Sequence, residues 1–280
     1  MLIGVVGLGL IGGSFAKAYT KAGHQVLAMD IDESVIQYAL MSGAIDGELK
    51  RDDLKDCDLI LICTYAGAAV KFLEENGKYI GTKPIVIDCC GIKRIIVDKG
   101  MEIAKKYGFV YAGGHPMAGT QYSGIKYSRD DMYVGAPMVI CPPNYDDIVL
   151  LEKIKKMLMP VGFAGITVTS ADEHDEMIAY TSQLAHVVSN AYIKSPTVHR
   201  HNGMSAGSYK DMTRVAWLSP EMWTELCMCN RDNLIKELDI LSENLEKYRQ
   251  ALENEDSELL MKLFYEGKKM KEDVDADDEN

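Results

Sequence analysis

Hydrophobic positions in the first 170 residues fall into short runs separated by longer amphipathic segments. The runs are rich in β-branched residues and read LIGVV, QVLAM, LILIC, PIVID, FVYA, PMVIC and GITVT. Short apolar runs that alternate with helix-length segments are typical of parallel strands joined by crossover helices. The pattern therefore predicts an α/β domain over residues 1–170, with a doubly wound, mostly parallel sheet covered by helices.

The pattern changes after Ser170, where strand-like runs stop and helical spacing takes over. Ser219 followed by Pro220 is a typical helix start. We predict an all-helical second domain over residues 171–270 and an acidic, disordered tail over residues 271–280. Apolar residues recur at helical spacing near the end of this domain, and they suit a core stripe, a dimer interface or both; they are Leu234, Leu238, Leu241, Leu245 and Tyr248.

Charge and cysteine content narrow the class of protein. The 280 residues carry a net charge of −12, which argues against a nucleic-acid or membrane surface as partner. The seven cysteines include no C-x-x-C pair, so we expect neither a disulfide framework nor a zinc site, and a reducing cytoplasm is the simplest location. The apolar amino terminus lacks a basic leader and continues into a folded motif, so we expect neither a signal peptide nor a membrane anchor.

A glycine motif follows the first predicted strand. Gly7, Gly9 and Gly12 stand in G-x-G-x-x-G order and open a helix near Ile11. The second strand ends at Asp30, about the expected distance downstream for a carboxylate that binds the adenosine ribose. A tight strand-to-helix turn without a ligand is the simpler alternative. We predict a Rossmann-type dinucleotide site, with the turn residues Leu10 and Ile11 at the phosphates.

The residues around Asp30 also bear on the kind of dinucleotide. The segment MDIDESV holds Asp30, Asp32 and Glu33 but no arginine. Carboxylates would repel a ribose 2′-phosphate, so NAD is favoured over NADP. Thr64, after the run LILIC, is expected to contact the same cofactor.

A histidine in the stretch YAGGHPMAGT is the candidate catalytic group. His115 follows the run FVYA, and we expect this segment to leave the strand at the carboxyl edge of the sheet, where such folds bind ligands. Gly113, Gly114 and Pro116 would constrain the backbone so that the ring points at a bound molecule. A histidine that only caps a loop is the alternative interpretation.

Four motifs together resemble one enzyme family. GLGLIGGS, GGHPMAGTQYSG, DEHDEMIAYTSQLAH and KDMTRVAWLSPEMW, in this order, closely resemble the prephenate dehydrogenases of tyrosine biosynthesis, including their arogenate-using relatives. The resemblance extends to about residue 250. It implies an NAD-dependent oxidoreductase that converts prephenate to 4-hydroxyphenylpyruvate by oxidative decarboxylation, or arogenate to tyrosine, and a homodimer formed through the helical domain.

The resemblance also implies roles for individual residues. His115 matches the catalytic histidine, and a neutral imidazole can accept the proton that the ring hydroxyl releases as hydride leaves. Arg214 matches the arginine that binds a substrate carboxylate, for which its planar fork is suited. His186 matches a histidine that helps to bind substrate, and it shares a helix face with Ser182. Ser182 and Thr120 are further candidate substrate contacts.

Two neighbouring polar residues are interpreted as structural. His174 and Asp175 are expected to form an acidic, polar helix start. Together with His186 they lack compact metal-ligand spacing, so we expect no metal.

The chain departs from the family pattern at Gly91. Members often carry serine there, in D-x-x-S-x-K, whereas this chain reads DCCGIK. We expect one hydrogen bond of the site to be missing or to come from Thr120, Ser123 or a water.

Gln121 bears on the choice of substrate. A neutral amide cannot offset the ammonium group of arogenate, which favours prephenate. Less favoured alternatives are a 3-hydroxyacid dehydrogenase, whose helical lysine has a counterpart only at Lys194, and a non-catalytic NAD-binding regulator.

Overall fold

The computed structural model describes residues 1–278, with side chains described through residue 276. Within this range the chain forms an eight-stranded sheet in the order β3-β2-β1-β4-β5-β6-β7-β8. All neighbouring strands are parallel except β6 and β7, which are antiparallel. The strands are β1 (Leu2–Val6), β2 (Gln25–Met29), β3 (Gly47–Glu48), β4 (Leu59–Ile62), β5 (Ile85–Asp88), β6 (Val110–Pro116), β7 (Pro137–Cys141) and β8 (Gly165–Val168).

Each of the seven predicted apolar runs forms a strand, and the doubly wound fold is confirmed. The two-residue strand β3 was not predicted. It continues the sheet beyond β2 with the pairs Leu27–Gly47 and Ala28–Glu48. A strand this short carries no alternating pattern from which it could be recognised.

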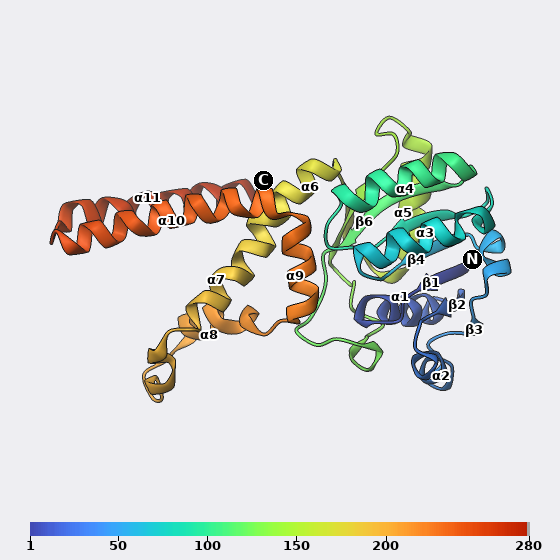
Figure 1. Cartoon of the computed structure of the whole chain (residues 1–280), viewed down its shortest axis with the longest axis horizontal. Helices are drawn as coiled ribbons and strands as arrows, with labels where there is room; N and C mark the ends of the chain where they lie inside the picture. The colour runs from blue at the N-terminus through green and yellow to red at the C-terminus, as the bar shows by residue number, and fades with distance from the viewer. Residues whose placement is uncertain (279–280) are drawn as a thin grey trace. The chain divides into compact units, whose positions relative to one another are not determined.

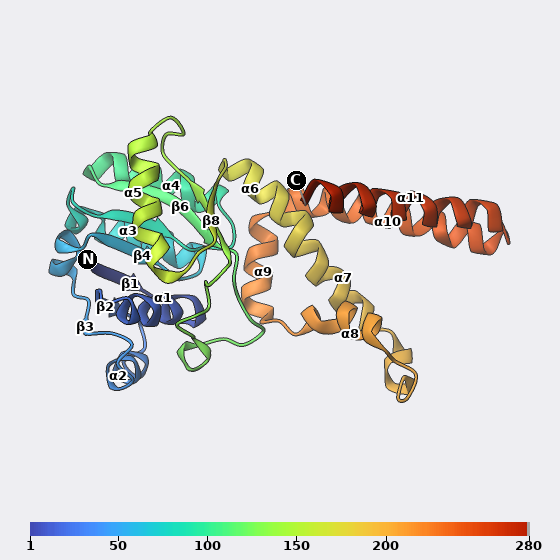
Figure 2. The same ribbon diagram turned by 180° about the vertical axis from the view of Figure 1, so that it is seen from behind.

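Helices cover both faces of the sheet (Figures 1 and 2). One hydrophobic core joins the sheet to α1 (Leu10–Lys21), α2 (Glu33–Met41) and α5 (Ile148–Leu158). A second core, on the other face, joins it to α3 (Ala66–Ile80) and α4 (Arg94–Tyr107). Strand β4 shows why the runs are continuously apolar: Leu59 and Leu61 enter the first core, and Ile60 and Ile62 the second. A strand buried on both faces has no polar side.

The helical region begins at Ser170, whose hydroxyl accepts a hydrogen bond from the backbone N–H of Glu173. Helix α6 (Ala171–Ile178) continues through a π-helical segment (Ala179–Leu184) into α7 (Ala185–Tyr192). Helix α8 (Gly207–Thr213) and the short 3₁₀ turn Arg214–Ala216 follow. Ser219 caps α9 (Pro220–Cys229) through the backbone N–H of Met222, so the predicted helix start is confirmed.

Contacts between residues divide the chain into two compact units, residues 1–230 and residues 231–280. The first unit contains α6 to α9 together with the sheet, whereas the sequence pattern changes at Ser170. Helix α6 contacts α4, and this packing joins the first helices of the helical region to the α/β domain. Near Ser170 the chain therefore changes from alternating strands and helices to helices alone, but it does so within the first compact unit.

The second unit is a pair of helices, α10 (Arg231–Glu253) and α11 (Ser257–Asp278). They lie side by side, and the Tyr248 hydroxyl donates to the Leu263 carbonyl at 3.3 Å. Helix α11 runs on through residue 278, which differs from the expected disorder of residues 271–278. Two acidic residues of this segment are paired one turn apart with lysines, Glu272 with Lys268 and Asp275 with Lys271, and such pairs support a helix. Residues 279–280 of that segment lie outside the described residues.

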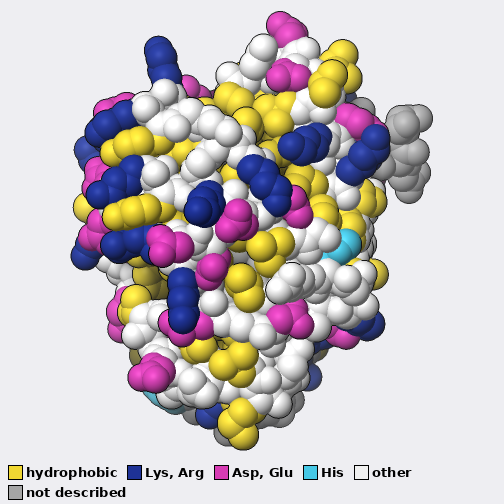
Figure 3. Space-filling model, turned by 90° about the vertical axis from the view of Figure 1, so that its right-hand side faces the viewer, with side chains coloured by type: hydrophobic (Ala, Val, Ile, Leu, Met, Phe, Trp, Pro, Cys, Tyr) yellow, Lys and Arg dark blue, Asp and Glu magenta, His cyan; other side chains and the backbone are white. Residues whose placement is uncertain are grey.

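The predicted apolar stripe of α10 is only partly buried. Leu234 is buried, Leu238 and Leu241 are half-buried, and Leu245 is 59% exposed. Figure 3 shows hydrophobic side chains between basic and acidic ones on one face of the molecule. Within residues 1–278, no helix combines the length and hydropathy needed to cross a bilayer.

Candidate active site

The glycine turn between β1 and α1 is closely packed on its inner side. A Cβ on Gly7 would lie 2.7 Å from the Thr64 methyl carbon, and Gly7 has a φ of +88°. A Cβ on Gly12 would lie 1.8 Å from the Gly7 carbonyl oxygen. A Cβ on Gly9, by contrast, would meet no other described atom within 4 Å. The turn thus requires glycine at positions 7 and 12 and leaves its backbone approachable at Gly9.

Helix α1 starts beside this approachable backbone. Gly9 is its N-cap and supplies no side-chain hydrogen bond, so the first-turn N–H groups near Leu10 and Ile11 are not capped by a side chain of that residue. The partly exposed Asp30 carboxylate accepts hydrogen bonds from Leu8 N at 2.7 Å and Asp32 N at 3.0 Å. The end of β2 is therefore tied to the glycine turn, and Asp30 keeps lone pairs for a further donor.

His115 lies within strand β6, not after it as expected. Its segment pairs with β7 in antiparallel register, with His115 opposite Val139, and this pairing extends the strand past the parallel part. Gly113 and Gly114 allow close packing: added Cβ atoms would lie 2.5 Å from Val97 Cγ2 and 2.5 Å from the Asp88 carbonyl, respectively. The two glycines therefore let the strand pack closely against the neighbouring backbone and side chains. His115 itself is partly exposed.

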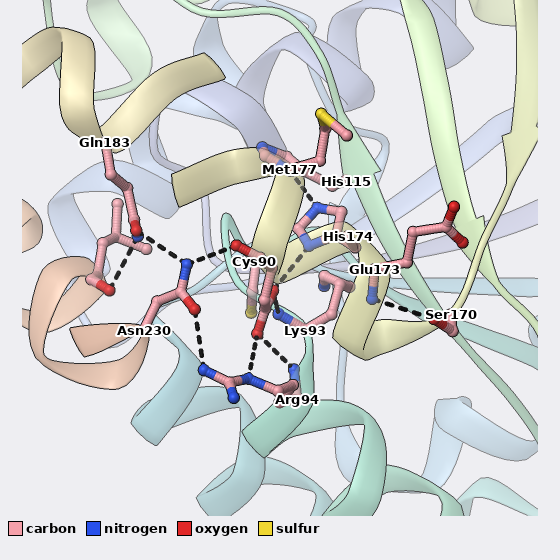
Figure 4. Close-up of polar contacts among 12 residues, drawn as sticks. Cys90, Lys93, Arg94, His115, Ser170, Glu173, His174, Met177, Gln183 and Asn230 are labelled. Carbon is pink, nitrogen blue, oxygen red and sulfur yellow. Dashed lines mark hydrogen bonds and ion pairs between the residues drawn. The ribbon is translucent and has the colours of Figure 1, made fainter. Parts of the chain in front are cut away.

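A chain of three side chains runs inward from His115 (Figure 4). His115 Nδ1 lies 2.8 Å from His174 Nε2, and His174 Nδ1 lies 2.7 Å from Asp175 Oδ1. His174 and Asp175 lie near the start of helix α6, as expected, but His174 is 4% exposed and Asp175 is fully buried, so their contacts in the protein interior were not predicted. The sequence offered one signal that His174 would be buried. Ile178 follows it by one helical turn, so the two side chains share a helix face, and both are buried.

Asp175 also joins helix α6 to the start of α4. Its carboxylate accepts the backbone N–H groups of Lys93 at 2.7 Å and Arg94 at 2.9 Å. Burial would raise the pKa of Asp175, but the hydrogen bonds from His174 and these two N–H groups lower it below its usual value. Asp175 is therefore an ionised carboxylate that can only accept hydrogen bonds.

A buried ion pair lies behind the site. Lys93 Nζ contacts the Asp88 carboxylate, and both side chains are fully buried. Asp88 also accepts hydrogen bonds from the Tyr111 hydroxyl at 2.6 Å and from Cys90 N at 3.0 Å. Burial would lower the pKa of Lys93, but the attraction of Asp88 raises it, so Lys93 remains charged.

The surroundings of His115 favour its neutral form. Its pKa lies well below the usual value, because burial, then His174 and then the charge of Lys93 disfavour a second proton. A neutral ring can accept a proton, as a general base must.

Gly91 lies at the other nitrogen of His115. A Cβ at this position would be 4.0 Å from His115 Nε2 and 3.2 Å from Leu226 Cδ2. The side-chain partner of His115 in the structure is His174, at Nδ1, whereas the Thr120 hydroxyl accepts the Tyr122 N–H. Because Gly91 has no side chain, Nε2 receives no hydrogen bond from this position.

His186, Ser182 and Arg214 come together in the helical region. His186 Nδ1 donates to the Ser182 carbonyl at 2.9 Å, across the π-helical segment. The ring stacks on Trp223 with centroids 3.8 Å apart, a contact not predicted from the sequence. Burial lowers the pKa of His186. The hydrogen bond to the Ser182 carbonyl opposes this shift, and the charge of Arg214 adds to it. The exposed Arg214 therefore lies close enough to act on the His186 ring.

Thr120 and Gln121 are exposed in the loop after β6. The structure thus shows where each predicted substrate contact lies, and their roles remain predictions.

A buried amide network connects these helices to α4 (Figure 4). Asn230 Nδ2 donates to the Asp175 carbonyl at 2.7 Å and to Gln183 Oε1 at 2.9 Å. Its Oδ1 accepts from Arg94 at 2.9 Å, and Gln183 in turn donates to the Leu226 carbonyl. The network links α4, α6 and α9 around the inner end of the His115 chain.

Two adjoining segments of the chain match the two domains of one known protein family. Residues 15–166 match the nucleotide-binding domain of prephenate dehydrogenase, and residues 170–266 match its dimerization domain. The chain belongs to the prephenate dehydrogenase family. The two matched ranges meet near Ser170, where the sequence pattern changes, and the predicted resemblance is confirmed.

Individual family members are similar over nearly the whole chain. Prephenate dehydrogenase of Bacillus subtilis is 29% identical over 272 residues, which are 93% of this chain and 72% of that protein. The crystal structure of Synechocystis arogenate dehydrogenase has a TM-score of 0.81 and 26% identity, covering 98% of this chain and 100% of that one. Prephenate dehydrogenase from A. aeolicus, in complex with hydroxyphenyl propionate and NAD⁺, has the same TM-score and identity, covering 98% of each chain.

Proposed function

We propose that this member of the family catalyses the NAD-dependent oxidative decarboxylation of prephenate to 4-hydroxyphenylpyruvate. The observation that carries the proposal is the neutral His115 ring, whose Nε2 lies near Gly91 while Nδ1 contacts His174. Family membership supports a dehydrogenase acting on prephenate or arogenate, since solved relatives of both kinds are equally similar to this chain.

The turn at α1 suits a dinucleotide. The approachable backbone at Gly9, the uncapped start of α1 and the Asp30 carboxylate would hold its pyrophosphate and ribose, with Gly7, Gly12 and Thr64 shaping the turn. The acidic segment around Asp30 supports NAD, because a 2′-phosphate would meet carboxylates. Bound NAD would accept the hydride that leaves C4 of the substrate ring.

His115 handles the proton of this reaction. As C4 is oxidised, its hydroxyl becomes a carbonyl and gives its proton to His115 Nε2. The carboxylate on C1 then leaves as carbon dioxide, and its bonding electrons restore the aromatic ring. The new phenolate oxygen recovers the proton from His115, so no net proton is consumed.

The helical region supplies the substrate contacts in this proposal. Arg214 would bind one carboxylate through paired hydrogen bonds, and His186, fixed by Ser182 and Trp223, would bind a second polar group of the substrate. Thr120 and Gln121 would complete the contacts from the loop after β6. The exposed apolar side chains of α10 and α11, such as Leu252 and Phe264, and the match to a dimerization domain support a homodimer.

The choice between substrates is tested by NADH absorbance with NAD plus prephenate and, separately, with NAD plus arogenate. Gln121 carries no charge to offset an ammonium group, so we expect a higher kcat/KM with prephenate. A higher kcat/KM with arogenate would assign the chain to the arogenate-using members, and no reduction with either compound would refute a dehydrogenase of this class.

Replacing Arg214 by alanine is expected to raise the KM for prephenate about 10- to 100-fold, while kcat changes less than about threefold. A charged hydrogen-bonding partner of a carboxylate contributes about 1.5–3 kcal/mol. Steady-state kinetics at saturating NAD measure the effect. Arg249→Ala is the control, because Arg249 is already paired with Glu246 and Glu253. An unchanged KM would remove Arg214 from the substrate site.

A further inference from the structure

We infer that Asp175 and His174 are positioning residues that fix which nitrogen of His115 is free to take the proton. The inference rests on the proposed function, because it concerns the same base. The contacts run in series from the N–H groups of α4 to Asp175, from Asp175 to His174 and from His174 to His115. The hydrogen bonds from α4 to Asp175 have only one possible direction, and they determine the direction of the others.

The direction is set at the buried end. Asp175 is an ionised acceptor that already receives two backbone N–H groups at the start of α4. The hydrogen between Asp175 Oδ1 and His174 Nδ1 must therefore belong to the imidazole. A neutral His174 then carries no hydrogen on Nε2, and that nitrogen can only accept.

The same logic applies to the next ring. Because His174 Nε2 accepts, the hydrogen in the 2.8 Å contact must come from His115 Nδ1. A neutral His115 then has its lone pair on Nε2, the nitrogen that lies near Gly91. The opposite tautomer of His115 would place two lone pairs against each other at Nδ1, or would require a second proton on the buried His174.

The arrangement also keeps the ring oriented during proton transfer. When His115 takes a proton at Nε2, its Nδ1–H can still donate to His174 Nε2, and His174 can still donate to the Asp175 carboxylate. A carboxylate that orients an imidazole through a hydrogen bond is an established device for positioning a histidine base. Here a second imidazole stands between the two groups, and the buried carboxylate belongs to helix α6 while the base belongs to β6.

Asp175→Asn tests the inference, because an amide keeps the shape of the side chain but can donate. Two donors of Arg94, its backbone N–H and its side-chain Nε, lie at Oδ2, so we expect the amide oxygen at that position and the NH₂ at the position of Oδ1, where it faces His174 Nδ1. The Lys93 N–H then loses its acceptor. His174 would then carry its hydrogen on Nε2 and donate to His115 Nδ1, which moves the His115 hydrogen to Nε2. We expect kcat to fall about 10- to 1,000-fold, the range of a general base, with the prephenate KM changed less than about threefold.

The readout specific to the inference is ¹⁵N NMR of histidine-labelled protein. The chain has six histidines, and His115→Asn and His174→Asn spectra assign the two rings. In the wild type both rings are expected to be protonated at Nδ1 and free at Nε2. In Asp175→Asn both are expected to be protonated at Nε2. A wild-type His115 protonated at Nε2, or an unchanged pattern in Asp175→Asn, would overturn the inference.

Glu173→Gln is the matched control, since Glu173 is the exposed neighbour on the same helix and accepts the Thr169 hydroxyl. It should leave kcat and both tautomers unchanged. If Asp175→Asn does not fold, the wild-type spectrum still decides the inference. An inactive wild type with the expected tautomers would refute the proposed function alone, and full activity of Asp175→Asn with unchanged tautomers would refute this inference alone.

Discussion

Replacing His115 by asparagine is expected to lower kcat for prephenate oxidation about 10²- to 10⁴-fold while NAD affinity changes less than about twofold. Asparagine is close to the shape of the inner part of the ring, but its amide has no lone pair basic enough to take a proton near neutral pH. Initial rates of NADH formation measure kcat, and a fluorescence titration measures NAD binding.

The effect on kcat should be specific to this ring. His24→Asn serves as the control, because His24 precedes β2 and faces the amino-terminal ammonium group at 3.4 Å. Its kcat should equal that of the wild type. Equal rates for His115→Asn and the wild type would mean that another group takes the proton, and lost NAD binding would show that His115 supports the cofactor site.

Replacing Lys93 by methionine is expected to lower the free energy of unfolding by about 3–5 kcal/mol, the usual cost of removing one partner of a buried ion pair. Methionine fills most of the volume but leaves the Asp88 carboxylate without its cation in a fully buried position. The Tyr111 hydroxyl and the N–H groups of Cys90 and Gly114 remain as donors, and they only partly compensate the charge. Urea unfolding followed by circular dichroism measures the change.

Two further variants test the cause of that loss. Lys99→Met, in helix α4 that follows Lys93, removes an exposed lysine paired with Glu102 and should change stability by less than about 0.5 kcal/mol. The double variant Asp88→Asn, Lys93→Met should be more stable than Lys93→Met, because no unpaired charge is left in the core. A Lys93→Met midpoint equal to that of the wild type would contradict a structural role of the pair.

The sequence was sufficient for elements whose cause is local. Strands such as β4 are recognisable because burial on both faces requires an unbroken apolar run. The glycine turn is recognisable because positions 7 and 12 tolerate no Cβ, and the start of α9 because Ser219 caps it within one turn. These features depend on residues close together in the chain. The family motif around His115 was recognisable for the same reason, because its residues are continuous in the sequence.

What only the tertiary structure decided is the role of residues whose partners are distant in sequence. In the sequence, His174 and Asp175 resemble an ordinary acidic, polar helix start, since nothing near them shows that α6 packs on the start of α4, 81 residues earlier. The same packing brings His174 to His115 across 59 residues. Local sequence determines whether a polar residue can start a helix, but the contacts made by the folded chain determine whether that residue meets water or another side chain.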